Sequence, residues 1–63
     1  MVKLKLKDKE WEVKPRMRLG DAVRSIGISP LSVLAIRDGK MLTEDIILQD
    51  GDEITLISVI SGG

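Results

Sequence analysis

The 63-residue sequence contains no cysteine and no histidine. Without cysteine there is no disulfide, no thiolate metal site and no cysteine nucleophile. Without histidine the chain lacks the commonest general base, pH switch and metal ligand. The serines therefore have no histidine to activate them, and no motif supports a serine–lysine pair. These absences predict a protein with no catalytic side chains, and therefore not an enzyme. A loose acidic group could still suggest a metal site, but it lacks the ligand spacing of a calcium loop, so we interpret it as a solvated turn and expect no metal. The group consists of Glu44, Asp45, Asp50, Asp52 and Glu53.

The chain also lacks a net charge and a long apolar run. Ten basic residues balance ten acidic residues, so the positive field of a nucleic-acid binder is missing. No apolar run approaches the roughly 20 residues that cross a bilayer, and lysines interrupt the first residues too often for a signal peptide. We therefore expect a cytoplasmic protein that binds neither nucleic acid nor membrane.

What the chain does contain is enough apolar material for one small domain. Hydrophobic residues make up 43% of the sequence, which is sufficient for a core and argues against disorder. We assign residues 1–59 to this domain and residues 60–63 to a flexible carboxyl-terminal tail. The assignment follows from Gly62 and Gly63, because two consecutive glycines support no regular structure without an entropic cost.

Alternating apolar and charged residues predict a β-hairpin at the start of the chain. Residues 2–7 and 10–14 both show the period of two that is typical of half-buried strands. A turn at residues 8–9 would place Leu6 opposite Trp11, the only aromatic residue. The same register would set lysines opposite glutamates on the other face, which is a favourable arrangement.

The period then changes to that of an amphipathic helix. Leu19, Ala22, Val23 and Ile26 stand at i, i+3, i+4 and i+7 and would share one face. Gly27 suits the left-handed position that follows the last turn of a helix. The helix start is less well marked, because no Ser, Thr, Asp or Asn precedes Leu19 directly.

The second half of the chain predicts three more strands. A buried strand at 33–37 is joined by an Asp-Gly turn to a short strand at 40–42, and residues 53–59 form the longest β-run. The order strand, strand, helix, strand, strand, strand indicates an α+β fold, with one helix on one face of a mixed sheet. The first and last strands can pair in parallel at the sheet centre, because the segment between them permits the crossover.

The carboxyl-terminal residues form the first candidate site. Gly62 and Gly63 place no side chain near the terminal carboxylate, so this end can enter a narrow channel and reach a nucleotide phosphate in another protein. A terminal Gly-Gly alone is a weak signal, since many domains end in frayed residues. Its combination with this fold pattern favours a functional tail.

The last strand carries the second candidate site. Ile54 and Leu56 share one face, whereas Ile57 and Val59 share the other. If the first pair packs on the helix, the second pair lies on the open face near the tail. An exposed apolar patch is often a partner site. The alternative is that a loop or the tail covers Ile57 and Val59.

Together these features resemble the β-grasp, ubiquitin-like sulfur carriers of the ThiS/MoaD type. The resemblance spans the whole chain and is clearest in residues 33–40, 48–54 and 59–63. The closing Ile-Ser-Gly-Gly is most similar to the carriers of tRNA thiolation and to the archaeal small modifier proteins. The resemblance implies a β-grasp fold with the order ββαβββ.

The resemblance also implies a chemistry. An E1-like adenylyltransferase would use ATP to adenylate the carboxylate of Gly63, and the carrier would need no cofactor of its own. A sulfur donor, such as a cysteine desulfurase or a rhodanese, would convert the adenylate to a thiocarboxylate. A downstream sulfur-accepting enzyme would then use it for tRNA thiolation or for thiamine or molybdopterin synthesis. Ile60, Ser61 and Gly62 would thread the partner's active site, and Ile57 and Val59 would form the docking patch.

Two other functions stay open at this point. In some relatives the same activated terminus is attached to lysines of target proteins, so a ubiquitin-like protein modifier is one alternative. A plain β-grasp interaction module is the other, and it needs no free Gly-Gly end. Whether the mature chain ends at Gly63 discriminates between the module and the carrier, and the sequence does not name the pathway that receives the sulfur.

Overall fold

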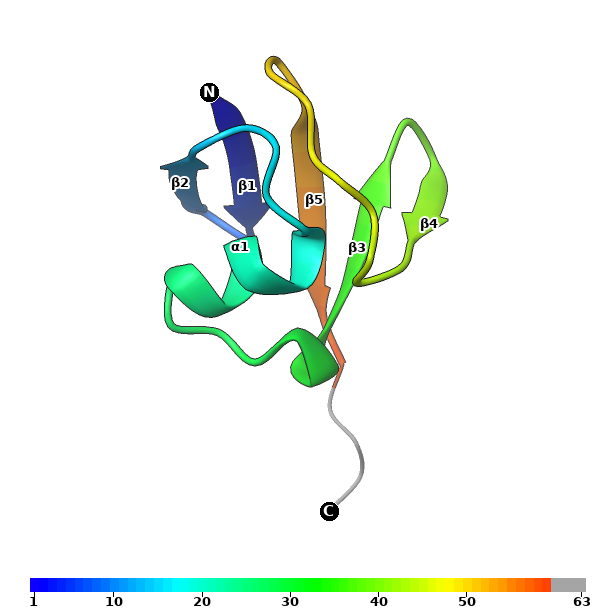
Figure 1. Ribbon diagram of the computed structural model, residues 1–63. Helices are drawn as coiled ribbons and strands as arrows, with labels where there is room; N and C mark the ends of the chain where they lie inside the picture. The colour runs from blue at the N-terminus through cyan, green and yellow to red at the C-terminus, as the bar shows by residue number, and fades with distance from the viewer. Residues whose placement is uncertain (60–63) are drawn as a thin grey trace.

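Within residues 1–59, which the computed structural model describes, five strands form one mixed sheet and one α-helix crosses one of its faces (Figure 1). The elements in chain order are β1 (Val2–Leu6), β2 (Lys9–Val13), α1 (Leu19–Ser25), the 3₁₀ helix η1 (Pro30–Ser32), β3 (Val33–Arg37), β4 (Lys40–Leu42) and β5 (Glu53–Ser58). The sheet order is β2-β1-β5-β3-β4, with β1 and β5 parallel at the centre and the other neighbours antiparallel. The predicted α+β, β-grasp fold is confirmed.

The β1–β2 hairpin forms, but its predicted register is wrong. Leu6 pairs with Lys9, so the turn occupies residues 7–8, one residue earlier than predicted. Trp11 therefore lies opposite Leu4. The register moves by two residues, which keeps every side chain on its predicted face. Lysines still stand opposite glutamates in the observed register, so neither the apolar nor the charge pattern could separate the two alternatives.

The core lies between α1 and the sheet, and the central strands supply its middle. Ile54 and Leu56 of β5 are 0% and 2% exposed, as their shared parity predicts. Trp11 packs against this core while it stays partly exposed. The buried apolar residues are Val2, Leu4, Val13, Leu19, Ala22, Val23, Ala35, Leu48, Ile54 and Leu56.

The carboxyl end of α1 closes as the sequence predicts. Gly27 has a φ of 84°, and its N–H donates to the carbonyl oxygen of Arg24 at 3.0 Å. The N–H of Ile28 then donates to the carbonyl oxygen of Val23 at 3.2 Å, which completes a Schellman closure. Among residues 1–59, no helix combines the length and apolarity that crossing a membrane requires.

The amino end of α1 is capped by the loop that precedes β5. The N–H groups of Leu19 and Gly20 donate to the carbonyl oxygens of Ile46 and Glu44, at 2.8 and 3.0 Å. These contacts satisfy two donors that the first helical turn leaves unpaired. A glycine permits the close approach, because a Cβ on Gly20 would lie 3.1 Å from Oε1 of Glu44. The loop is therefore a structural part of the fold.

Candidate functional site

The carboxyl-terminal end of β5 leads to the first candidate site. The predicted tail residues Ile60, Ser61, Gly62 and Gly63 lie outside the described residues. The structure describes β5 and Val59, which lead to them. The N–H of Val59 donates to the carbonyl oxygen of Ser32 at 2.8 Å. This hydrogen bond fixes the chain beside η1 where it leaves the sheet (Figure 1).

The second candidate site is exposed, as its parity predicts. Ile57 and Val59 are 46% and 40% exposed, whereas their neighbours Ile54 and Leu56 are buried. Among the described residues, no loop therefore hides these two side chains from solvent. Whether a partner docks on them stays a prediction, because exposure of an apolar residue does not identify its partner.

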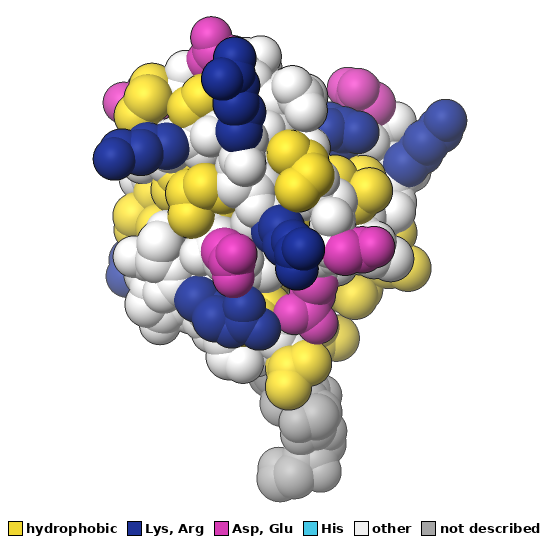
Figure 2. All heavy atoms as spheres, in the orientation of Figure 1, with side chains coloured by type: hydrophobic (Ala, Val, Ile, Leu, Met, Phe, Trp, Pro, Cys, Tyr) yellow, Lys and Arg dark blue, Asp and Glu magenta, His cyan; other side chains and the backbone are white. Residues whose placement is uncertain are grey.

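Leu34 extends this apolar surface, and its exposure corrects one prediction. It lies opposite Ile57 in the β3–β5 register and is 39% exposed. The prediction that residues 33–37 form a buried strand is wrong, because only Ala35 is buried there and α1 covers only one face of the sheet. Figure 2 shows hydrophobic side chains gathered at the lower right of the described surface, on the side of β3 and β4.

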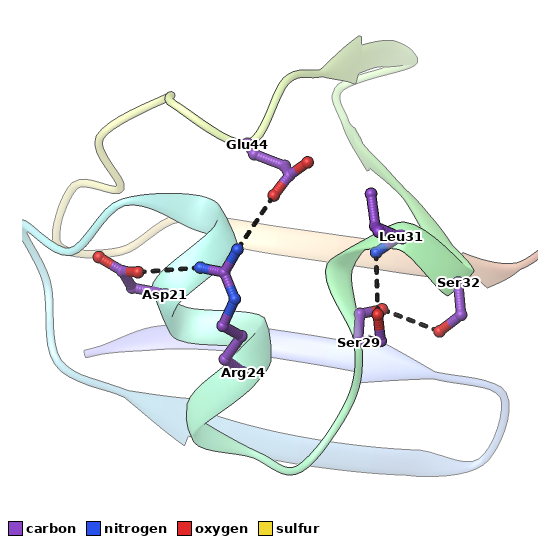
Figure 3. A network of polar contacts seen from close by, with 6 residues as sticks. All are labelled: Asp21, Arg24, Ser29, Leu31, Ser32 and Glu44. Atoms are coloured by element: carbon purple, nitrogen blue, oxygen red, sulfur yellow. Dashed lines mark hydrogen bonds and ion pairs between the residues drawn. The ribbon is translucent and has the colours of Figure 1, made fainter.

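The turn η1, next to the end of β5, is held by short-range polar contacts (Figure 3). The N–H of Leu31 donates to Oγ of Ser29 at 3.3 Å, and Oγ of Ser32 donates to the carbonyl oxygen of Ser29 at 2.8 Å. Pro30 occupies the first helical position, for which its fixed φ is suited. The sequence pattern Ser-Pro predicts such a helix start, and it is the signal by which η1 could have been found.

A groove runs between η1 and the end of β4. It has a volume of about 500 Å³, and Leu31 at its outer lip is 84% exposed. Its lining is apolar except at the end near Thr43 and Glu44. The residues that line it are Pro30, Leu31, Val33, Leu34, Leu42, Thr43, Glu44 and Val59.

Charged side chains near the groove pair with one another. Arg24 contacts Asp21 at 3.1 Å and Glu44 at 3.5 Å, and all three side chains are about half exposed (Figure 3). Exposed pairs of this kind contribute little to stability. A hydrogen bond from Thr43 holds the pKa of Asp45 below its usual value of 3.8. Among residues 1–59, no group of three or more acidic side chains is arranged to hold a metal ion.

Two comparisons with known proteins identify relatives of this chain. The model of the ThiS family matches residues 2–63, which include the predicted tail. The sulfur carrier protein TtuB of Thermus thermophilus is 35% identical over 55 residues, which cover 87% of this chain and 85% of TtuB. Both similarities extend over nearly the whole fold and are not confined to one motif.

Proposed function

The chain belongs to the ThiS family, and from this premise we propose that it carries sulfur on the terminal carboxylate of Gly63. An E1-like adenylyltransferase transfers AMP from ATP to this carboxylate and releases pyrophosphate. The terminal sulfur of a persulfide on a sulfur donor, such as a cysteine desulfurase or a rhodanese, then attacks the adenylate and displaces AMP, which gives an acyl disulfide. A second thiol cleaves this S–S bond, forms a disulfide with the donor cysteine and releases the thiocarboxylate. The product is a thiocarboxylate, whose sulfur a downstream enzyme accepts. The carrier itself contributes its terminus and its binding surface, and the partners contribute the catalysis.

The observation that carries the proposal is the family match, which runs to residue 63, together with the similarity to a named sulfur carrier. The geometry of β5 supports it. The strand begins in the sheet centre, where Ile54 is fully buried, and ends at Ser58, directly before Val59, which is 40% exposed. The central strand therefore leads the chain out of the sheet at an exposed position, where another protein can bind the four residues that follow Val59.

The decisive experiment changes the length of the tail. One variant lacks Gly63, and a second carries one additional residue after it. Each residue displaces the carboxylate by roughly 3.3–3.6 Å, whereas reaction requires the attacking oxygen within about 3–3.5 Å of the phosphorus of ATP. Both variants should therefore lose ATP–pyrophosphate exchange with the E1-like enzyme encoded in the same genome.

The control is the thermal stability of the same variants, which should stay close to that of the parent chain. Intact mass identifies the product, because conversion to a thiocarboxylate exchanges one oxygen for one sulfur, and it also establishes that the starting chain ends at Gly63. Full exchange without Gly63 would refute the carrier and favour a plain interaction module. A covalent product with a protein lysine, in place of a thiocarboxylate, would favour the protein modifier.

A further inference from the structure

Leu31 is the most exposed large apolar side chain in residues 1–59, at 84%. A single exposed leucine is common on protein surfaces and needs no explanation by itself. This one differs because it projects from a braced turn and stands at the lip of an apolar groove. That turn also lies next to the end of β5, where the chain leads to the proposed reactive terminus.

Short-range hydrogen bonds and a proline hold the backbone around Leu31. Ser29 accepts a hydrogen bond from the N–H of Leu31 and another, through its carbonyl oxygen, from Ser32 (Figure 3). Pro30 restricts the backbone directly before Leu31. The N–H of Val59 then ties the turn to the end of β5 through the carbonyl oxygen of Ser32. A side chain presented from a braced turn loses little backbone freedom when a partner binds it, which favours affinity.

The groove behind Leu31 exists because β4 is short. β4 pairs with β3 only over Ala35–Arg37, and the chain turns away toward α1 after Leu42. The edge of β3 at Val33 and Leu34 therefore has no strand beside it on that side within the described residues. An apolar side chain from another protein can occupy this space.

The length of the tail identifies the protein that must lie there. Four residues, 60–63, follow Val59, and even a fully extended chain covers only roughly 3.3–3.6 Å per residue, or about 13–14 Å in total. An enzyme that reacts with the carboxylate of Gly63 must bring its active site within this distance of Val59. Val59 lines the same groove as Leu31, so the groove lies within reach of the surface of that enzyme.

We propose that Leu31 inserts into an apolar pocket of the E1-like adenylyltransferase, next to the channel that receives the tail. The groove formed by Leu34, Leu42 and Val59 accepts an apolar side chain of the enzyme in return. This inference rests on the proposed function and adds a second contact to the patch at Ile57. Leu31 is thus a positioning residue, which holds the carrier while the tail occupies the active site.

The test compares Leu31→Asp with Ile47→Asp in the complete chain. Ile47 is also an exposed aliphatic residue, at 44%, but it lies in the loop beside Arg18, away from the groove. Carrier concentration is varied in the ATP–pyrophosphate exchange assay with the E1-like enzyme from the same genome. Leu31→Asp should raise KM for the carrier at least tenfold and leave kcat at saturation unchanged. Leu31→Met should have the KM of the parent chain, because methionine keeps the apolar volume of leucine. Ile47→Asp should also have the KM and kcat of the parent chain.

Three results would overturn the inference. An unchanged KM in Leu31→Asp would mean that the enzyme does not touch this side chain. An equal rise in Ile47→Asp would assign the effect to negative charge in general. A fall in the thermal midpoint of Leu31→Asp, together with failure of Leu31→Met to restore KM, would give Leu31 a structural role. Absence of exchange with the parent chain is a different outcome, because it refutes the proposed function itself.

Discussion

At its amino end, β5 follows a turn that polar contacts tie to three other parts of the fold. The N–H of Gly51 donates to the carbonyl oxygen of Met1 at 3.1 Å, and the N–H of Lys3 donates to that of Asp52 at 2.9 Å. The Asp52 carboxylate also accepts a hydrogen bond from the guanidinium of Arg37 at 2.9 Å, and both side chains are partly buried. The turn and the start of β5, residues 50–53, are thus hydrogen-bonded to the start of β1 on one side and to the end of β3 on the other. We call these residues the fastened end.

The carboxyl end of β5 is built in the opposite way. Ile57 and Val59 follow the buried Leu56 and are themselves 46% and 40% exposed. The hydrogen bond from Val59 to Ser32 holds the backbone beside an apolar groove. The two ends of this strand therefore contribute to two different properties, the stability of the fold and the binding of partners. Changes at its amino end and middle should alter the free energy of unfolding, and changes at its carboxyl end should alter the binding of partners.

The largest loss of stability is expected in the middle of β5. Leu56 is 2% exposed in the core, and replacing a buried leucine with alanine typically costs about 2–5 kcal/mol. A domain with a total stability of about 5–15 kcal/mol tolerates this poorly. Urea unfolding followed by the fluorescence of Trp11, the only aromatic residue, measures the effect. If Leu56→Ala does not fold, Ile54→Val should still lower the urea midpoint, because it should reduce the free energy of unfolding by about 0.5–1.5 kcal/mol. Parent-like midpoints in both variants would contradict the packing.

An intermediate loss is expected at the fastened end. The Asp52 carboxylate accepts hydrogen bonds from Arg37 and from the N–H of Gln49, at 2.9 and 2.8 Å. Hydrogen bonds to charged groups contribute about 1.5–3 kcal/mol each before relaxation, so Asp52→Ala should cost about 2 kcal/mol. Asp52→Asn is the matched control, because it retains an oxygen for Gln49 and loses only the charge. If both variants have the urea midpoint of the parent chain, the Asp52 carboxylate does not stabilise this end of the strand.

The contrast between the two ends also shows how far the fold is predictable from sequence. The sequence predicts β3 and β4 with the bounds that the structure has, because Asp38-Gly39 forms a tight turn with φ of 52° and 78°. The cap on α1 could not be predicted in the same way. It consists of backbone carbonyls from residues 44 and 46, and Gly20, which permits their approach, does not by itself identify them.

The candidate site was only partly predictable, for a similar reason. The parity of β5 predicts that Ile57 and Val59 are exposed, and this is confirmed. Leu34 was assigned to a buried strand, because an apolar run does not reveal that a helix covers only one face of a sheet. The groove beside Leu31 depends on the path of the chain after Leu42, which the predicted strand bounds do not determine. Residues 60–63 lie outside the described residues, so their role stays a prediction.

A small, pH-dependent effect is expected at Asp50, also at the fastened end. A hydrogen bond from the amino-terminal ammonium group of Met1 lowers the pKa of this carboxyl below 3.8, and the positive charge adds to the effect. A group whose pKa falls on folding stabilises the protein above its unfolded pKa, and this contribution disappears as the pH falls through the folded pKa. Asp50→Asn should therefore lower the urea midpoint slightly at neutral pH and leave it unchanged in strong acid.

The matched control for Asp50 is the chain itself with its amino terminus acetylated. Acetylation removes the ammonium group and keeps the carboxylate, so it should reproduce the effect of Asp50→Asn at neutral pH. Intact mass must first show that Met1 is retained, because the contact depends on it. A difference that persists unchanged in strong acid would exclude the ion pair as its cause.

The smallest change in stability, with the largest expected change in binding, concerns Ile57→Asp at the carboxyl end. Ile57 is 46% exposed, so a carboxylate there keeps its water in the free protein, whereas docking would bury it without a partner at a substantial cost. The urea midpoint should stay near that of the parent, and KM for the carrier in ATP–pyrophosphate exchange should rise at least tenfold. Thr55→Asp is the control, since Thr55 is exposed in the same strand, nearer the fastened end, and lies beside Lys5. Unfolding of Ile57→Asp would place this residue in the core, and an equal rise in KM for Thr55→Asp would remove the distinction between the two ends.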